Sequence, residues 1–288
     1  MPSLTILPPP LNGLRDNSEM TQGRILIVAG SDSGGGAGIQ ADIKAVTALG
    51  GFAMTAISAL TAQNTQGVHA IHDVPADFVG EQMRVVLEDI GADCIKIGMI
   101  HRLEIIDAVA DALDRYGVGI PLVVDTVMVA KGGAKLLVDE AVDGLKTRLV
   151  SRATLITPNI PEAEVLTGMR ITTDELAAEA GRQLMALGSS AVLMKGGHLD
   201  GPRVTDLLIE ESGETGFEGP RLMTRHTHGT GCTLASACAT GIAQGLSLHD
   251  AVARARDYVF EAIRTAPGLG RGHGPLNHGH TVRPFKQV

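Results

Sequence analysis

A glycine-threonine-glycine turn followed by a cysteine is the part of this chain best suited to chemistry. Residues 226–232 read His-Thr-His-Gly-Thr-Gly-Cys and run into small, helix-compatible residues up to Gly241. The first N–H groups of a helix lack intrahelical partners and the helix dipole adds positive potential, so such a turn can hold an anion. Cys232 would stand in the first helical turn, where the same field favours a thiolate. The pattern predicts a phosphate cradle beside a base; the alternative is a capping turn with Cys232 as a small core residue.

Two carboxylates, Asp125 and Glu162, follow predicted strands and are the best candidates to organise Mg²⁺, directly or through water. This ion keeps several waters beside one or two protein carboxylates. Glu162 also follows Pro161, so the alternative is a first-turn helix carboxylate favoured by the dipole. Asn159 could bind a phosphate or a metal-bound water, or form an Asx turn before the helix. Lys195 ends an apolar strand and suits the phosphates of ATP, unless its ammonium extends into solvent.

A second glycine-rich loop, Gly-Ser-Asp-Ser-Gly-Gly-Gly-Ala-Gly at residues 30–38, follows a short apolar run. It lacks the Gly-Lys-Ser/Thr that ends a Walker A loop. Residues 50–62 contain no carboxylate. A dinucleotide fingerprint needs an acidic residue about 20 positions on, so its absence weighs against a dehydrogenase. Because glycine has no side chain, the backbone here can approach a ligand closely; the alternative is a tight turn.

The elements that must position these residues alternate along the chain from Arg24. Apolar runs and helical periodicity predict an α/β fold with a mostly parallel central sheet and helices on both faces. A turn at residues 211–216 predicts a small antiparallel edge. The expected strands are 25–29, 52–60, 68–74, 94–98, 122–125, 154–157, 191–195 and 204–209, and the expected helices are 37–49, 76–90, 102–116, 139–150, 161–168, 173–187, 229–244 and 248–265. Since ligands bind at the carboxyl ends of parallel strands, the polar residues above should converge on one site.

Composition limits the class of protein. The length of 288 residues fits one large α/β domain, expected over 24–288 after a loose tail at 1–23. A net charge of −8 argues against nucleic-acid or anionic-membrane partners. No apolar run reaches membrane-spanning length. The three cysteines are an odd number in a long chain, which indicates reduced thiols and a cytoplasmic protein.

The remaining cysteines and histidines have ordinary explanations. Cys94 and Cys238 each lie inside an apolar element and are expected to be buried. His226 and His228 form a His-x-His pair, but finger-like zinc spacing is missing. His228 is expected either near the nucleotide or satisfied by local hydrogen bonds.

Taken together, seven segments resemble the hydroxymethylpyrimidine/phosphomethylpyrimidine kinases of thiamin biosynthesis, which belong to the ribokinase-like fold. The resemblance runs from about residue 24 to residue 278, and the segments are 29–42, 62–65, 96–99, 125–128, 157–162, 193–198 and 226–232. It implies ATP-dependent phosphorylation of 4-amino-5-hydroxymethyl-2-methylpyrimidine, and then of its monophosphate to the pyrophosphate. It also implies Mg²⁺ as cofactor and a homodimer.

The resemblance implies roles for single residues. Cys232 takes the place where most ribokinase relatives have an aspartate base, and the helix terminus is expected to lower its pKa from about 8.5. Gln63 would bind the aminopyrimidine edge, because an amide can accept from the exocyclic amine and donate to a ring nitrogen. The other implied contacts are an anion hole from the Gly229, Thr230 and Gly231 amides, a ring sandwich by Met99 and Val127, backbone near the hydroxymethyl end from Gly30 and Ala37, and nucleotide contacts from Lys195, Asn159 and Thr227.

Two alternative functions remain. A pyridoxal or pyridoxine kinase would have the same fold, but relatives that specialise in pyridoxal often carry a second cysteine on the flap that here reads Val-Met-Val-Ala-Lys-Gly-Gly at 127–133. Ala130 and the absence of a thiol in that flap favour the thiamin precursor. A catalytically silent sensor of pyrimidine or nucleotide is the other alternative; the intact turn at 229–232 and both carboxylates count against it.

Overall fold

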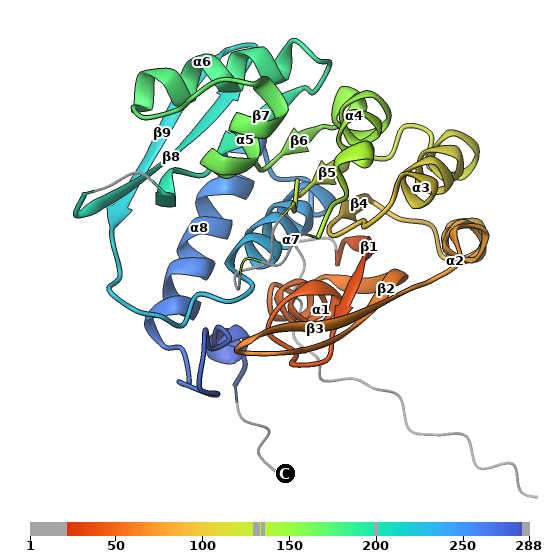
Figure 1. The fold of residues 1–288 in the computed structure, drawn as a ribbon, viewed down its shortest axis with the longest axis horizontal. Helices are drawn as coiled ribbons and strands as arrows, with labels where there is room; N and C mark the ends of the chain where they lie inside the picture. Colours follow the sequence, from red (N-terminus) through yellow and green to blue (C-terminus); the bar gives the residue numbers. More distant parts are fainter. Residues whose placement is uncertain (1–21, 129–132, 134–135, 199–200, 284–288) are drawn as a thin grey trace, which may run out of the picture.

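The computed structural model describes residues 22–128, 133, 136–198 and 201–283. Within them a nine-stranded sheet has the order β3-β2-β1-β4-β5-β6-β7-β8-β9 (Figure 1). The strands are β1 (Arg24–Asp32), β2 (Phe52–Asn64), β3 (Gly67–Asp73), β4 (Cys94–Ile97), β5 (Leu122–Val124), β6 (Leu155–Ile156), β7 (Ala191–Met194), β8 (Arg203–Glu210) and β9 (Gly213–Pro220). The α-helices are α1 (Gly38–Ala48), α2 (Ala76–Asp89), α3 (Leu103–Tyr116), α4 (Val142–Gly144), α5 (Ile160–Thr167), α6 (Asp174–Met185), α7 (Thr230–Ala243) and α8 (Leu248–Arg264).

Six central strands, β2-β1-β4-β5-β6-β7, pair in parallel, which confirms the predicted mostly parallel sheet. The predicted antiparallel edge is also confirmed, since β8 pairs with both β7 and β9 in antiparallel fashion. The sequence did not predict that β2 and β3 form a second antiparallel hairpin at the opposite edge. Its turn lacks the usual Asn-Gly signal and uses an Asx turn instead, in which the Asn64 side chain accepts from the Gln66 N–H at 2.9 Å.

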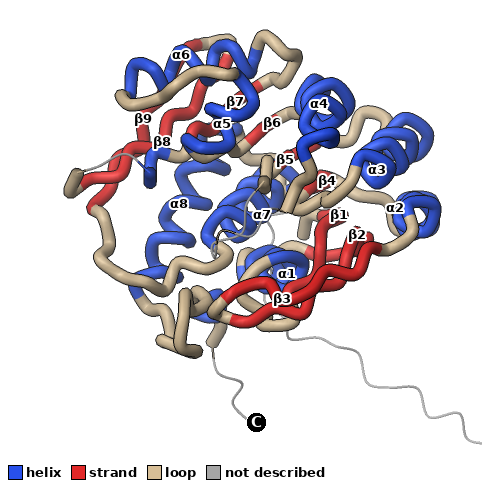
Figure 2. The backbone as a smooth tube through the Cα atoms, viewed as in Figure 1, coloured by secondary structure: helices blue, strands red, loops and turns tan. Residues whose placement is uncertain are grey.

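Helices cover both faces of the sheet, as predicted (Figure 2). One apolar cluster packs α2, α3, α5 and α6 against one face, and a second packs α1, α7 and α8 against the other. The buried strands β1 and β4–β7 separate these two clusters and consist mostly of aliphatic residues, as expected of parallel strands covered on both sides. The carboxyl ends of the strands are therefore the place where polar residues can gather.

The prediction of one continuous helix at 139–150 is wrong. That segment is divided into the short turns η1 (Asp139–Ala141), α4, η2 (Leu145–Leu149) and η3 (Val150–Arg152). Gly144 lies in its middle, and glycine weakens a helix interior. A Cβ at this position would lie 2.4 Å from Leu103 Cδ1, so Gly144 packs closely against the start of α3.

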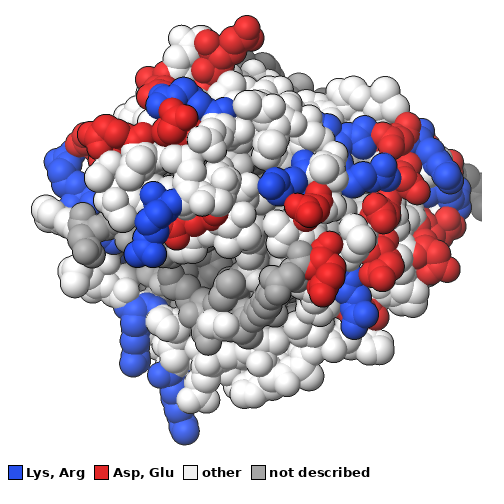
Figure 3. Space-filling view, turned by 45° about the horizontal axis from the view of Figure 1, so that its top comes forward, with Lys and Arg blue, Asp and Glu red and all other residues white. Residues whose placement is uncertain are grey.

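Basic and acidic side chains are interspersed on the face shown in Figure 3. Ion pairs at the surface include Arg84 with Glu81 and Arg148 with Asp111. Among the described residues, no helix combines the length and the apolar character needed to cross a membrane. Residues 1–21 of the predicted tail lie outside the described residues.

Candidate active site

A cavity of about 1020 Å³ lies at the carboxyl ends of the parallel strands. It brings together residues from the two glycine-rich loops, from the ends of β2, β5 and β7, and from the start of α7. All fourteen predicted site residues line it: Gly30, Ala37, Gln63, Met99, Asp125, Val127, Asn159, Glu162, Lys195, Thr227, Gly229, Thr230, Gly231 and Cys232. The predicted convergence is confirmed, and the individual roles remain predictions.

The start of α7 is shaped by close packing of the two glycine-rich loops. Gly229 caps the helix with a φ of 84°, and a Cβ there would lie 1.8 Å from the Gly36 carbonyl oxygen. The Thr230 N–H donates to the Thr227 carbonyl at 3.3 Å, and its hydroxyl donates to the same oxygen at 2.8 Å. Because the Thr230 amide is already engaged, the predicted anion hole rests on the Gly229 and Gly231 amides.

Cys232 lies at the cavity wall, and the expectation that the helix terminus lowers its pKa is wrong. Burial raises the pKa of the thiol to about 12, and the nearby Asp42 and Asp125 carboxylates add to this shift. The Lys96 ammonium and a hydrogen bond from the Gly38 N–H oppose it without reversing it. The desolvation of a charged sulfur therefore outweighs the favourable contacts that this sulfur makes with Lys96 and Gly38. Cys232 is a thiol at neutral pH.

A buried ion pair lies close to Cys232, in the protein interior beneath the cavity. Lys96 Nζ lies 3.0 Å from both carboxylate oxygens of Asp42, and neither side chain is exposed. Ser236 donates to Asp42 at 2.7 Å and stands one helical turn after Cys232 on the same face of α7. The pair thus connects β4, α1 and α7 beneath the site. The resemblance to the kinase family covers both residues, but sequence reasoning assigned them no role.

Replacing Lys96 with methionine is expected to lower the free energy of unfolding by about 3–5 kcal/mol, because Asp42 would stay buried without its counterion. Urea denaturation of the Lys96→Met variant measures this change. The double variant Lys96→Met/Asp42→Leu should recover most of the loss, since an apolar pair of similar volume is often tolerated. Unchanged stability of the single variant would contradict the importance of the pair.

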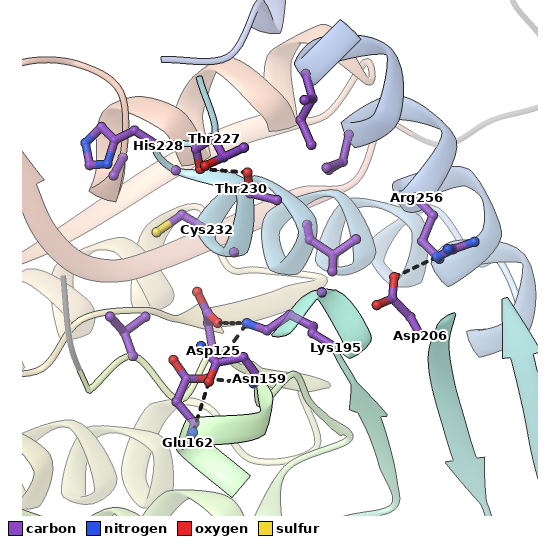
Figure 4. Close-up of a pocket in the computed structure, with 18 of the residues that line it drawn as sticks. Asp125, Asn159, Glu162, Lys195, Asp206, Thr227, His228, Thr230, Cys232 and Arg256 are labelled. Atoms are coloured by element: carbon purple, nitrogen blue, oxygen red, sulfur yellow. Dashed lines mark hydrogen bonds and ion pairs between the residues drawn. The ribbon is translucent and has the colours of Figure 1, made fainter. Parts of the chain in front are cut away.

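Asp125, Glu162 and Lys195 form a second charged cluster, which faces Cys232 across the cavity (Figure 4). Lys195 Nζ lies 3.2 Å from Asp125 Oδ1 and 3.8 Å from Glu162 Oε2. Burial opposes the charge of Lys195, but the two carboxylates together raise its pKa, so it stays cationic. Gly231 lies close to this cluster, since a Cβ added to it would lie 3.4 Å from Lys195 Nζ and 3.6 Å from Asp125 Oδ2.

The donor set of this cluster fits a magnesium ion. Asp125 Oδ2 is buried and has no hydrogen-bond partner among the described residues, and a hard cation would satisfy it. Only two carboxylates lie here, and within the described part of the chain no group of three or more His, Cys, Asp or Glu residues is arranged to hold a metal. Such a site suits Mg²⁺, which keeps most of its water.

Asn159 and Glu162 also have the structural role that was weighed as the alternative. They form a capping box at the start of α5, in which the Asn159 side chain accepts from the Glu162 N–H and Glu162 Oε2 accepts from the Asn159 N–H, each at 2.9 Å. Thr126 donates to the same Oε2 at 3.1 Å. These contacts use one oxygen of Glu162, so the cap and a metal role are compatible.

The apolar end of the cavity lies near Met99. Met99 and Val127 belong to one small apolar cluster with Ala59 and Leu136, and a Cβ on Gly30 would lie 2.3 Å from Met99 Cε. The Ala37 N–H donates to Asp32 at 2.8 Å, and its carbonyl accepts from the Ala41 N–H within the start of α1. The amide is thus engaged, whereas the carbonyl keeps a second lone pair, and the close approach of this backbone to a ligand stays a prediction.

Sequence reasoning missed several residues that line the cavity. Asp32 accepts from the Gly34, Gly36 and Ala37 amides and pairs with His228 at 2.9 Å, so it organises the first glycine-rich loop. A carboxylate before a run of glycines could have indicated this Asx-type role. The hydrogen bond of His228 to Asp32 agrees with one of the two expectations for this histidine, that its hydrogen bonds are satisfied within the protein.

At the far end of the cavity, Asp206 and Arg256 form an ion pair at 2.7 Å, which joins β8 to α8 (Figure 4). No local motif indicates this pair. Residues 129–132 of the flap lie outside the described residues.

This arrangement is that of a small-molecule kinase with a ribokinase-like fold. The pyridoxal kinase from Staphylococcus aureus in complex with ADP is a structural neighbour, with a TM-score of 0.84 and 30% identity over 91% of this chain and 95% of that one. Sequence narrows the class further. The family model described as phosphomethylpyrimidine kinase matches residues 32–277, and the chain belongs to this family.

Two curated relatives support the assignment. The hydroxymethylpyrimidine/phosphomethylpyrimidine kinase of Bacillus subtilis is 47% identical over 256 residues, which cover 88% of this chain and 94% of that protein. The thiamine biosynthesis bifunctional protein ThiED of Geobacter sulfurreducens is 53% identical over 257 residues, or 89% of this chain. The matched region is 52% of ThiED, so the chain spans about half the length of that relative.

Proposed function

We propose that this protein transfers the γ-phosphoryl group of ATP to hydroxymethylpyrimidine and then to its monophosphate, in thiamin biosynthesis. The observation that carries the proposal is the composition of one cavity. An apolar end with the amide of Gln63 lies in the same cavity as the cationic, anion-binding end formed by Lys195 and the start of α7. Cys232 lines the cavity opposite the charged cluster. A flat heteroaromatic alcohol and a nucleoside triphosphate match these two ends.

In the first transfer, the hydroxymethyl oxygen forms a bond to the γ-phosphorus as the bond from that phosphorus to ADP breaks. The hydroxyl proton passes to the sulfur of Cys232, which acts as the base in its deprotonated form. The Gly229 and Gly231 amides and Lys195 stabilise the negative charge on the transferred group. The chain thereby contributes alignment and electrostatic stabilisation, which carry most of the catalysis in phosphoryl transfer.

Asp125 and Glu162 are the residues that would hold Mg²⁺, with Asp125 Oδ2 as the available oxygen. When bound, the ion neutralises charge on the phosphates of ATP. Asn159, next to the carboxylates, and Thr227, at the entry to α7, complete the proposed nucleotide contacts. The nucleoside would lie toward the far end, where Phe260 and Ile263 of α8 line the cavity beside the Asp206–Arg256 pair.

A kinase assay with ATP and Mg²⁺ tests the proposal. Hydroxymethylpyrimidine, its monophosphate and pyridoxal are compared as acceptors, and the products are resolved by chromatography. Both pyrimidines are expected to be phosphorylated much faster than pyridoxal. Turnover of pyridoxal alone would instead identify a pyridoxal kinase, and turnover of none of the three would favour a silent sensor.

The proposal also covers the domain organisation, the oligomeric state and the location of the enzyme. We propose that residues 24–288 form a single catalytic domain, that the protein is a homodimer and that it is cytoplasmic. The three free thiols, Cys94, Cys232 and Cys238, support a reducing compartment. Light scattering of the purified full chain measures the oligomeric state.

A further inference from the structure

The side-chain amide of Gln63 is held between two groups at the wall of the cavity. Its Oε1 lies 3.1 Å from the Thr61 hydroxyl, and its Nε2 lies 3.3 Å from Nε2 of His228. The two ends of an amide differ in chemistry and hardly in shape, so their identities follow from what each partner can donate or accept. Both partners here have fixed hydrogen-bonding roles.

Thr61 has one hydroxyl hydrogen and two possible recipients. The backbone carbonyl of Ser31 lies 2.8 Å from Thr61 Oγ1 and can only accept. An oxygen pair at this separation requires a hydrogen between the atoms, so the Thr61 hydrogen belongs to Ser31. Toward Gln63, Thr61 can then only accept, and the amide end beside it must be the NH₂ group.

His228 leads to the same result from the other side. Its Nε2 lies 2.9 Å from Oδ2 of Asp32, and that carboxylate already accepts from the Gly34, Gly36 and Ala37 amides. Burial opposes the charge on Asp32, but its hydrogen bonds with His228 and with the Ala37 and Gly34 amides keep its pKa below the ordinary value, so it is ionised and can only accept. Nε2 of His228 must therefore carry a proton. A protonated Nε2 has no lone pair, so an NH₂ group of Gln63 at 3.3 Å from this atom would find no acceptor there.

We infer that Thr61 and His228 lock the amide of Gln63 with its nitrogen toward Thr61 and its oxygen toward His228, the reverse of the arrangement given above. One N–H and one oxygen lone pair then remain for a ligand, in a fixed order along the cavity wall. This order matches a ring nitrogen beside an exocyclic amine. A 4-oxo ring carries an N–H beside a carbonyl, so it would place two donors against each other and two acceptors against each other. Thr61 and His228 are thus positioning residues for pyrimidine selectivity, an inference that rests on the proposed function.

Equilibrium binding of two compounds tests the lock without relying on turnover. Calorimetry measures the Kd of hydroxymethylpyrimidine and of its 4-oxo analogue for the full-length protein. The parent should prefer the amine by about 100-fold or more, because the analogue leaves buried polar groups unpaired. Thr61→Val removes the acceptor at nearly constant volume and frees the amide to rotate. The ratio of the two Kd values should then fall about tenfold or more, in line with the loss of one buried hydrogen bond.

Matched variants separate the lock from a merely structural role. Thr61→Ser keeps the hydroxyl and should keep the parental ratio. His228→Leu should lower the ratio as Thr61→Val does, and His226→Leu, in the same turn, should not. A parental ratio in both Thr61→Val and His228→Leu would overturn the lock. Failure of the parent protein to bind hydroxymethylpyrimidine would overturn the proposed function itself, and a parental ratio in Gln63→Ala would remove Gln63 as the selective group.

Discussion

Replacing Cys232 with alanine is expected to lower the turnover of hydroxymethylpyrimidine by about 10²–10⁴-fold, the usual contribution of a positioned base. The KM values for ATP and for the pyrimidine should stay within a few-fold of the parent, because the change removes a single heavy atom, Sγ, from the cavity wall. Steady-state kinetics measure all three quantities. Cys238→Ala is the matched control, since Cys238 is a fully buried thiol on the same helix. Turnover of the Cys232→Ala variant within a few-fold of the parent would remove Cys232 from the base role.

The two phosphorylations should respond differently to this change. A primary alcohol must lose its proton as the new bond to phosphorus forms. A phosphate monoester has already lost its second proton at neutral pH, since that pKa is about 6. A base therefore has a proton to accept only in the first transfer. Cys232→Ala should slow the phosphorylation of the monophosphate far less than that of the alcohol, and equal losses would indicate that Cys232 acts by positioning.

The raised pKa of Cys232 gives the first transfer a defined pH dependence. A thiol with a pKa of about 12 is almost wholly protonated at neutral pH, and its deprotonated fraction grows about tenfold for each pH unit. The kcat for the alcohol should therefore rise with pH, without a plateau, between about pH 6 and pH 9. The Cys232→Ala variant should lose this rise. A plateau near neutral pH in the parent would mean that bound substrates lower the pKa of the thiol.

Much of the fold and the site could be predicted because local patterns carry them. Aliphatic runs ending in glycine or a polar residue predicted the parallel strands, and the rule that ligands bind at the carboxyl ends of such strands predicted the convergence. Gly229 is an example, since its place in a turn indicated the helix start that the structure has. The substrate was beyond such reasoning and came from the resemblance alone.

The features of the site that the sequence could not predict depend on packing between segments that are distant in the chain. The helix dipole at Cys232 is a local feature, but the desolvation that outweighs it depends on segments distant in the chain that enclose the sulfur. The same holds for the buried pair of Lys96 and Asp42, which are separated by 54 positions. Thr61 and His228 have no local sequence signal for the roles inferred for them. Their roles exist only because β1, β2 and the turn before α7 meet at one edge of the sheet.

Replacing Asp125 with asparagine should cause the second large loss of kinase activity. The change keeps the shape of the side chain and removes its charge, so Oδ2 is no longer available as an anionic ligand for Mg²⁺ and Lys195 loses its nearer counterion. We expect kcat to fall by about 10²–10³-fold, as when one preorganised electrostatic group is removed from an active site.

The dependence on Mg²⁺ distinguishes this role from a structural one. The Mg²⁺ concentration for half-maximal rate should rise in the Asp125→Asn variant. The Kd of hydroxymethylpyrimidine should stay unchanged, because the contacts proposed for the pyrimidine, Gln63 and Met99, do not include Asp125. Thr157→Val is the matched control, because it removes the hydroxyl 3.2 Å from Asp125 Oδ1 and keeps the carboxylate. It should leave the Mg²⁺ dependence close to that of the parent. Parental Mg²⁺ dependence in Asp125→Asn would mean that Asp125 serves mainly to keep Lys195 in place, and that the metal is held elsewhere in the cavity.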